Sequence, residues 1–379
     1  MQLFLLAYPW DLVDEGLGSR LDRLRGEVGV TGVCVWAAIP AVGELRTRDV
    51  SPRVFRSRGG VLFQPAERFY ANLRTQPIVS TWVRTSDPLK LVGDACAARD
   101  MELRAVISAS GLGRLAERYP ELTCRSAFGT ESVCSLCLGN AQVQDLLVAM
   151  AADLSSRAGV RALVLTDFVI AWSDCQVGEW EWGSPLGRVE QFLLGMCFCA
   201  ACVEHAEAGG VAATAARNSA VQLLHRSLEQ GTRSDESPVD FLSQQPAVVA
   251  YRRRQVQALN AFLRKLVEQC RCPIVVDAGA AEDQGEITPE AAIPWAWMSA
   301  VERVEQLSAS AKTAAARNEI RLPAWWATGA RGPQLIGLLP EAARLGIAAA
   351  TIDHYGVLPE PALTTLRQAI RFSRRTSSP

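Results

Sequence analysis

Apolar stretches alternate with amphipathic stretches along the whole chain. Each apolar stretch is short and continuous, as in a strand buried on both faces, and most are followed by residues whose apolar positions recur at helical spacing. This alternation predicts a parallel sheet with helices covering its faces. The predicted strands are residues 2–7, 31–39, 103–108, 162–166, 273–277, 301–307, 319–326 and 346–353.

Helical patterns accompany these strands, most clearly at residues 87–99, 141–158, 211–229, 248–269, 333–344 and 360–372. Eight parallel strands, each followed by a helix or helical connection, close naturally into a barrel, so we predict an α/β fold of the (β/α)8 TIM barrel class. Long loops follow strands 2, 3 and 4, on the face that carries the active site in TIM-barrel enzymes. An open doubly wound sheet is the competing architecture, but no Gly-rich phosphate turn follows the first strand.

The composition fits one soluble globular domain. Of 379 residues, 49% are hydrophobic and 21% charged, and we treat residues 1–379 as a single barrel whose last segment, 365–379, includes a frayed basic tail. The net charge is -1, so no electrostatic signature points to nucleic acid or an anionic membrane. No apolar run approaches the ~20 residues of a membrane helix. The first residues lack the basic region and cleavage site of a signal peptide, so we expect a cytoplasmic protein.

Acidic side chains follow several predicted strands at the point where the strand ends. The segment 161–202 is the richest, since its strand stops at Asp167 and a long loop with acids, tryptophans and cysteines follows. Binding and catalytic groups sit on loops held by a rigid scaffold, which makes this end of the barrel the expected site. For any single Asp, an ion pair or a helix cap is the alternative. The acids concerned are Asp11, Asp167, Asp277, Asp353, Glu179 and Glu181.

These acids suit the hydrolysis of a glycoside. The reaction needs two carboxyl groups flanking the bond, ~5 to 5.5 Å apart for retention of configuration and ~6.5 to 9.5 Å apart for inversion. Neighbouring strands 4 and 5 can place Asp167 and Asp277 within that range. We assign Asp167 as nucleophile or electrostatic stabiliser and Asp277 as the acid/base. Glu179 or Glu181 is the second choice for acid/base, because a loop can deliver a proton donor.

Aromatic rings gather on the same predicted face. Flat apolar rings stack against the C–H faces of sugars, while their polar tips bind water or ligand. Arg84 is a candidate clamp for an anion, and His354 is a candidate acid, hydrogen-bond donor or metal ligand. Core packing is the alternative for several of the rings. The predicted substrate-binding residues are Trp10, Asp11, Trp82, Arg84, Trp172, Trp326, Asp353, His354 and Tyr355.

Cysteines at metal-ligand spacing lie in the loops after strands 3 and 4. They form the motifs Cys134-x-x-Cys137 and Cys197-x-Cys199-x-x-Cys202. Four thiolates at ~2.3 Å can surround zinc tetrahedrally, and such a structural site would staple two long loops together. Free buried cysteines are the alternative, since they are common in protein cores. We expect a structural zinc ion here and no organic cofactor.

A set of short motifs spans most of the chain. In order, they are Leu112-Gly113, Pro120, Ser126-Ala127-Phe128-Gly129, Ser135-Leu136-Cys137, Asp167, Cys197-Phe198-Cys199-Ala200-Ala201-Cys202 and Asp353-His354-Tyr355-Gly356-Val357. The set resembles a family of uncharacterised bacterial barrel proteins that are related in appearance to glycoside hydrolases and carry a Cys-Phe-Cys-x-x-Cys motif after strand 4. The resemblance implies Cys137, Cys197, Cys199 and Cys202 as the metal ligands, with Cys134 as this chain's own alternative.

The chain departs from the family pattern where the family has histidines. The family's Tyr-His after strand 2 corresponds to Ile39-Pro40, its His-Asn after strand 3 to Ala109-Ser110, and its His-rich loop to residues 177–191. If those histidines do chemistry in the family, this chain relies on carboxylates alone, acts on another substrate, or only binds.

Three functions follow in order of preference. The first is a glycoside hydrolase-like enzyme that acts on a carbohydrate or glycoside through paired carboxylates at barrel strand ends. The second is a catalytically inactive sugar-binding or scaffold protein derived from such an enzyme. The third is a metal-dependent lyase, isomerase or hydrolase with a metal near Asp353 and His354, which is disfavoured because the chain has only 3 histidines. The expected partner is a small-molecule or oligosaccharide ligand, and the sequence does not define an oligomeric state.

Overall fold

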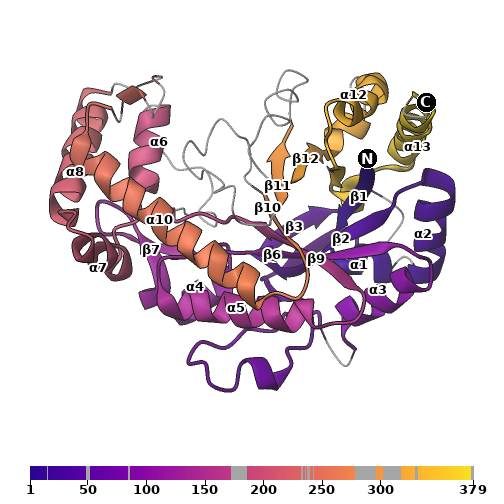
Figure 1. Ribbon diagram of the computed structural model, residues 1–379, viewed down its shortest axis with the longest axis horizontal. Helices are drawn as coiled ribbons and strands as arrows, with labels where there is room; N and C mark the ends of the chain where they lie inside the picture. Colours follow the sequence, from indigo (N-terminus) through magenta and orange to yellow (C-terminus); the bar gives the residue numbers. More distant parts are fainter. Residues whose placement is uncertain are drawn as a thin grey trace.

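The structure is a computed structural model (Figure 1). It describes the whole chain except residues 15, 48–51, 84–85, 172–185, 232–233, 235, 237–239, 242, 278–295, 302–316, 329–331 and 377–379.

Within the described residues, eight parallel strands pair in a closed ring. In ring order they are β1 (Gln2–Ala7), β2 (Gly32–Ile39), β6 (Glu102–Ser108), β9 (Val160–Thr166), β10 (Ile274–Asp277), β11 (Ala296–Ala300), β12 (Arg317–Pro323) and β13 (Ala349–Asp353). Strand β1 pairs with both β2 and β13, which closes the ring. The chain therefore has a TIM-barrel-like α/β fold, as the sequence predicts.

The strands are continuous apolar runs because both of their faces are buried. In β1, Leu3 and Leu5 pack into the large core between the sheet and the helices, whereas Phe4 and Leu6 pack inside the barrel. The barrel interior also holds a charged pair, in which Arg104 Nη1 lies 2.6 Å from Glu319 Oε2 and the guanidinium stacks on Phe4. Arg104 and Glu319 are each 1% exposed, so this end of the interior is dry and filled.

Helices cover the outside of the barrel. Two of them begin where the sequence supplies a capping side chain, since Asp87 accepts a bond from the Lys90 N–H and Asn140 from the Gln142 N–H. The helices of the barrel are α1 (Pro9–Val13), α2 (Leu17–Arg23), α3 (Pro88–Ala97), α5 (Ala141–Ser155), α10 (Pro246–Gln269), α12 (Gly332–Arg344) and α13 (Glu360–Thr376), together with the π-helical turn η1 (Leu24–Val28).

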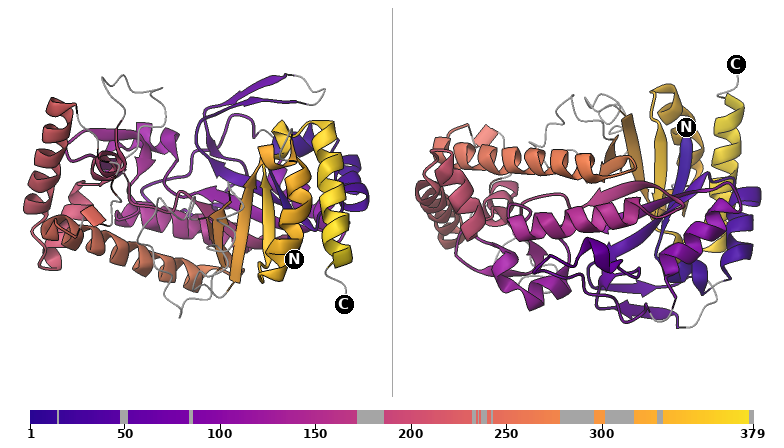
Figure 2. Two further views of the ribbon diagram at one scale, coloured as in Figure 1. Left: turned by 90° about the horizontal axis from the view of Figure 1, so that it is seen from above. Right: turned by 60° about the horizontal axis from the view of Figure 1, so that its bottom comes forward.

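The connections after β2, β6 and β9 carry further elements. The first holds the hairpin β3 (Val42–Leu45) and β4 (Val54–Ser57), the short strand β5 (Gly60–Val61) and η2 (Glu67–Phe69). The second holds α4 (Gly113–Arg118), η3 (Pro120–Leu122), β7 (Thr123–Arg125) and β8 (Glu131–Leu136). The third holds α6 (Arg188–Gly195), α7 (Ala200–Ala208) and α8 (Ala213–Gln230), which form a lobe at the opposite end of the molecule from α12 and α13 (Figures 1 and 2).

Two predicted strands are displaced in the structure. The sixth, predicted at 301–307, is β11 at Ala296–Ala300, and residues 302–316 lie outside the described part. The seventh, predicted to end at 326, ends at Pro323, and the residues that follow form the 3-10 turn η4 (Ala324–Ala327). The strand ends at Pro323 because proline has no N–H to continue the hydrogen-bonded ladder. The apolar run continues past the strand because Trp326 packs into the core from this turn.

Candidate functional site

The predicted strand-end acids that the structure describes lie at the C-terminal end of the barrel, in two groups. Asp167 follows β9, while Asp277 and Asp353 end β10 and β13, and these three surround Arg321 of β12. Asp11, in α1 directly after β1, belongs to a second group with Glu44 of β3 and His354 after β13.

The first group is centred on Arg321. Its Nε lies 2.7 Å from Asp277 Oδ2, and its Nη1 donates to Asp353 Oδ2 at 2.9 Å. Burial alone would lower the pKa of Arg321, but the charges of Asp277, Asp353 and Asp167 raise it overall. The guanidinium is therefore permanently charged, and it ties the ends of three strands together.

Asp167 is the most accessible acid of this group. Its side chain is exposed, and Oδ2 accepts hydrogen bonds from Ser108 Oγ at 2.6 Å and Thr166 Oγ1 at 3.3 Å. Its backbone has φ 52, in the left-handed region that non-glycine residues rarely adopt, and Ser110 Oγ donates to its carbonyl oxygen at 2.9 Å. Ser108 and Thr166 thus bind the carboxylate, while Ser110 supports the strained backbone that places it at the mouth of the barrel.

The ion pair with Arg321 bears on the role predicted for Asp277. The residue is 5% exposed, and an arginine at hydrogen-bonding distance favours the charged carboxylate. A general acid must carry a proton, so this environment suits charge stabilisation better than proton donation. Asp277 as acid/base stays a prediction, and the second choices for that role, Glu179 and Glu181, lie outside the described residues together with Arg84 and Trp172.

The second group joins two buried carboxylates and an imidazole. Asp11 is 1% exposed and Glu44 5%. His354 Nε2 lies 3.3 Å from Asp11 Oδ2, and His354 Nδ1 lies 3.6 Å from Glu44 Oε1. Arg46 lies beside them, with Nε 3.8 Å from Asp11 Oδ1 and Nη2 2.8 Å from Asp14 Oδ2.

Burial dominates the electrostatics of this second group. It raises the pKa of Asp11 well above the ordinary value, and the neighbouring charge of Glu44 raises it further, against the lowering effects of the Tyr8 N–H and Arg46. Two carboxylates this close in a dry place do not both stay charged without a compensating cation or proton.

The aromatic rings near the mouth differ in how much surface they offer. Trp10, Trp326 and Tyr355 are buried, at 0%, 1% and 1% exposure, so they pack in the core. The ring of Trp10 donates from Nε1 to Glu44 Oε2 at 2.8 Å, which fixes that carboxylate. The half-buried rings include Trp82, which the sequence indicated, and Tyr8 and Trp36, which it did not.

Tyr8 connects the rings to the histidine. It stacks on Trp10 at 4.5 Å and on Trp36 at 6.1 Å between ring centroids, and it meets the ring of His354 edge-on at 4.4 Å. Tyr8, Trp36 and His354 are each partly exposed, so they form a wall at the barrel mouth beside Asp353.

Sequence reasoning missed several polar or aromatic residues of the mouth besides Trp36, for different reasons. Glu44 lies in a hairpin that reads as an aperiodic loop, and Arg321 lies inside a strand where a charge carries no site signal. Tyr8 directly follows the first strand, as the predicted acids follow theirs. This strand-end position could have identified Tyr8 as a candidate site residue.

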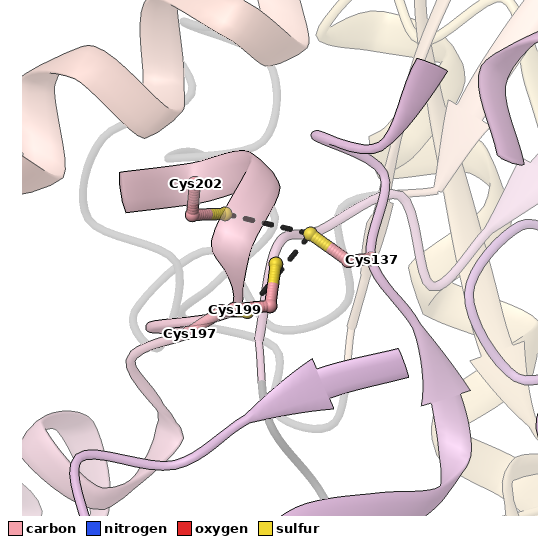
Figure 3. A group of neighbouring side chains, drawn as sticks. All are labelled: Cys137, Cys197, Cys199 and Cys202. Atoms are coloured by element: carbon pink, nitrogen blue, oxygen red, sulfur yellow. Dashed lines mark hydrogen bonds between the residues drawn. The ribbon is translucent and has the colours of Figure 1, made fainter. Parts of the chain in front are cut away.

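A separate cluster of four buried cysteines can hold a metal ion (Figure 3). Cys137 follows β8, whereas the other three come from the loop before α7 and its first turn, and the sulfurs point toward one another. Cys137 Sγ lies 3.4 Å from Cys202 Sγ and 3.9 Å from Cys197 Sγ. Bonds of ~2.3 Å to a tetrahedral zinc ion place sulfurs ~3.8 Å apart, so the cluster is compatible with structural zinc.

The surroundings of this cluster are compatible with a metal-thiolate site. The Arg125 N–H donates to Cys197 Sγ at 3.4 Å, while Tyr251 Oη and Gln255 Nε2 both donate to the Cys197 carbonyl. A Cβ on Gly139 would lie 3.3 Å from Cys202 Sγ and 3.5 Å from Cys137 Sγ, so glycine leaves room beside the sulfurs. Such contacts fix the orientation of the ligands.

Cys134 does not belong to this cluster. It is disulfide-bonded, and a cysteine in a disulfide has no thiolate to offer a metal. The prediction of Cys134 as an alternative ligand is therefore wrong. Sequence spacing alone could not show which of Cys134 and Cys137 joins the cluster, because both lie within reach of the loop that carries the other three cysteines.

Comparison with known proteins adds information on the fold. No protein-family model matches the chain, and no curated protein matches it. Among solved structures, a β-galactosidase from Marinomonas ef1 aligns at TM-score 0.57 with 11% identity, over 98% of this chain and 59% of the other. A β-galactosidase from Halorubrum lacusprofundi aligns at TM-score 0.58 with 10% identity, over 98% and 58%. The glycoside hydrolase domain of PgaB (BpsB) from Bordetella bronchiseptica aligns at TM-score 0.56 with 11% identity, over 98% of both chains.

The chain has a glycoside hydrolase-like fold. At these identities the similarity concerns the fold alone, and the chain spans about three-fifths of the length of the two β-galactosidases. No helix among the described residues is long and apolar enough to cross a membrane.

Proposed function

We propose that this glycoside hydrolase-like barrel acts on a carbohydrate or glycoside at its C-terminal mouth, and that Asp167 is the carboxylate that reacts with or stabilises the sugar. The observation that carries the proposal is the exposed Asp167 side chain, held by Ser108 Oγ at 2.6 Å at the end of a barrel strand. In TIM-barrel enzymes, polar groups at the ends of several strands converge on the active site.

The charged residues around Asp167 determine which chemistry is available at the barrel mouth. Arg321, held by Asp277 and Asp353, lies close enough to Asp167 to interact with its charge, and the exposed Asp167 carboxylate is placed to attack the sugar or to stabilise an oxocarbenium-like transition state. The proton donor then comes from another acid, and Glu179 or Glu181 on the loop after β9 are the candidates. Tyr8, Trp36 and Trp82 supply ring surface for stacking against a sugar.

A second function, sugar binding without hydrolysis, is favoured by a specific observation. Asp277 and Asp353 are both held in ion pairs with Arg321, at 2.7 Å and 2.9 Å. Arginine–carboxylate pairs at a barrel mouth can instead orient sugar hydroxyls. The two proposed functions use the same residues at the barrel mouth and differ only in whether a glycosidic bond breaks.

The test compares hydrolysis with binding. The wild type, Asp167→Asn and the control Asp145→Asn are assayed on a panel of aryl glycosides and oligosaccharides, and binding is followed by calorimetry. Asparagine adopts positive φ readily, so Asp167→Asn keeps the backbone, while Asp145 is an exposed residue on α5 that pairs with Lys265. If Asp167→Asn loses hydrolysis while the wild type and Asp145→Asn keep it, the result supports the enzymatic function. Binding without hydrolysis by the wild type supports the sugar-binding function. If the wild type neither hydrolyses nor binds any member of the panel, the proposal is overturned.

We also propose that the four-cysteine cluster holds a structural zinc ion. Cys137, Cys197, Cys199 and Cys202 would hold the ion and so tie the segment after β8 to α7. Because all four candidate ligands are buried cysteines, and four thiolates fill the coordination of a tetrahedral ion, the ion would serve folding and not the reaction.

A further inference from the structure

The group Asp11, Glu44 and His354 presents metal-ligand atoms that lie within 4.8 Å of one another. They come from three separate elements, α1, β3 and the residue before the turn η6 (Tyr355–Val357). His354 Nε2 lies 3.3 Å from Asp11 Oδ2 and His354 Nδ1 lies 3.6 Å from Glu44 Oε1, so each ring nitrogen faces a different carboxylate. Only one ring nitrogen can bind the ion, and ligands ~2.1 Å from a tetrahedral ion lie ~3.4 Å from each other. The three ligand atoms, which lie within 4.8 Å of one another, would therefore have to move closer together when the metal binds.

Each carboxylate is fixed through one oxygen and offers the other. The Tyr8 N–H holds Asp11 Oδ2 at 2.9 Å, and Trp10 Nε1 holds Glu44 Oε2 at 2.8 Å. Asp11 Oδ1 and Glu44 Oε1 are buried and have no hydrogen-bond donor among the described residues. A buried acceptor without a donor is costly, so two of them side by side indicate a missing partner.

The two unpaired oxygens point to the same place. A Cβ on Gly356 would lie 1.7 Å from Glu44 Oε1 and 2.7 Å from Asp11 Oδ1, so the backbone of η6 closes over both atoms. Only glycine fits there. The space between the two oxygens and the imidazole is thus bounded by the polypeptide on one side and by the partly exposed His354 on the other.

The charge of the group calls for a cation. Asp11, Glu44 and Asp14 share one arginine, Arg46, whose Nη2 is taken by Asp14 and whose Nε stays 3.8 Å from Asp11. Three carboxylates against one guanidinium leave a surplus of two negative charges, which a divalent cation would cancel. A single shared proton between Asp11 and Glu44 would cancel half of it and is the competing explanation.

We propose that Asp11, Glu44 and His354 bind a divalent transition-metal ion, Zn²⁺ or Mn²⁺, at the barrel mouth. Two carboxylates with an imidazole suit these ions better than Ca²⁺ or Mg²⁺, which prefer oxygen alone. Three protein ligands leave coordination positions open, and His354 is the ligand that faces the mouth. The site is distinct from the cysteine cluster, and it stands whether or not the barrel hydrolyses sugars.

The test counts metal ions per chain. The wild type, Glu44→Gln, His354→Gln and the control His225→Gln are dialysed against Zn²⁺ and Mn²⁺, passed over a sizing column and analysed by mass spectrometry for both metals. His225 is an exposed residue on α8. We expect the wild type and His225→Gln to hold one ion more per chain than Glu44→Gln and His354→Gln. Because the result is a difference, it does not depend on the occupancy of the cysteine cluster.

A second measurement identifies the ligand and guards against misfolding. The electron spin-echo spectrum of the Mn²⁺-loaded wild type should show coupling to a histidine nitrogen, which His354→Gln abolishes while its circular dichroism stays native. Equal metal content in the wild type and in both ligand variants would overturn the proposal and leave the shared proton as the explanation. Bound Mn²⁺ without nitrogen coupling would also overturn it.

Discussion

At the scale of single residues, the site depends on a few side chains whose surroundings decide their chemistry. Asp167 is exposed and held by hydroxyls, whereas Asp277 is buried and paired with Arg321, and Asp11 is buried beside Glu44. These three acids read alike in the sequence, as carboxylates at strand ends. Their roles differ because of neighbours that come from other strands.

Removing the serine that holds Asp167 tests the catalytic assignment. Ser108→Ala deletes the donor 2.6 Å from Asp167 Oδ2, and a hydrogen bond to a charged group contributes about 1.5–3 kcal/mol. If Asp167 reacts with the sugar, kcat on a glycoside that the wild type hydrolyses should fall by about 10- to 100-fold. Ser110→Ala is the matched control, since that hydroxyl bonds only the Asp167 carbonyl. Equal losses in both variants would mean that the serines merely support the loop.

Gly356 offers a test of the crowded second group. Gly356→Ala places a methyl group 1.7 Å from Glu44 Oε1, so we expect a loss of about 1–3 kcal/mol in the free energy of unfolding, measured by urea denaturation. Gly337→Ala, in α12 with nothing within 4 Å of its Cβ, should instead stabilise the protein by about 0.5–1 kcal/mol. A neutral Gly356→Ala would show that η6 does not close over the carboxylates.

At the scale of elements, the sequence predicts strands well and connections poorly. Strand β1 falls where the apolar run 2–7 places it, and β6, β9 and β10 are displaced by one or two residues. The hairpin β3–β4 was missed because its two short strands show no clear alternation of apolar and polar residues, with the apolar Leu45 and Val54 exposed and the charged Glu44 buried. Side chains in such connections take their positions from tertiary contacts, here Trp10 and His354, and not from local pattern.

The cysteine cluster is the element-scale test of metal binding. Chelation of zinc, or Cys199→Ser, should lower the thermal midpoint and loosen α7, because an ion present at a hundredfold excess over its dissociation constant stabilises the folded state by about 2.7 kcal/mol. Cys272→Ser, at a half-buried cysteine outside the cluster, is the control. A thermal midpoint that chelators leave unchanged would contradict the zinc proposal.

At the scale of the whole molecule, closure of the barrel brings together residues that are distant along the chain. Strand β1 lies between β2 and β13, so Tyr8, Asp11 and Glu44 meet His354 across more than 300 residues. The count and order of strands could be predicted from hydrophobic periodicity, and with them the face that carries the site. The contacts among the acids could not be predicted, because they depend on strand register and on Arg321, a charged residue inside a predicted strand.

The filled interior of the barrel can be tested with the Arg104–Glu319 pair. Arg104→Met leaves Glu319 charged and buried without its partner, which should cost about 3–5 kcal/mol in the free energy of unfolding. The double variant Arg104→Met/Glu319→Gln should recover most of that loss. If the double variant is no more stable than the single one, the pair does not act as a unit.

The measurement that tests the account most directly is hydrogen–deuterium exchange of the wild type with and without a carbohydrate ligand from the binding screen. We expect protection at the C-terminal ends of β6 and β9, at residues 108–110 and 166–168, and at 353–357 after β13, with no change in α7 and α8. Those segments carry Ser108, Asp167, Asp353 and His354. Protection confined to the α7–α8 lobe, or none with saturating ligand, would contradict a carbohydrate site at the mouth of the barrel.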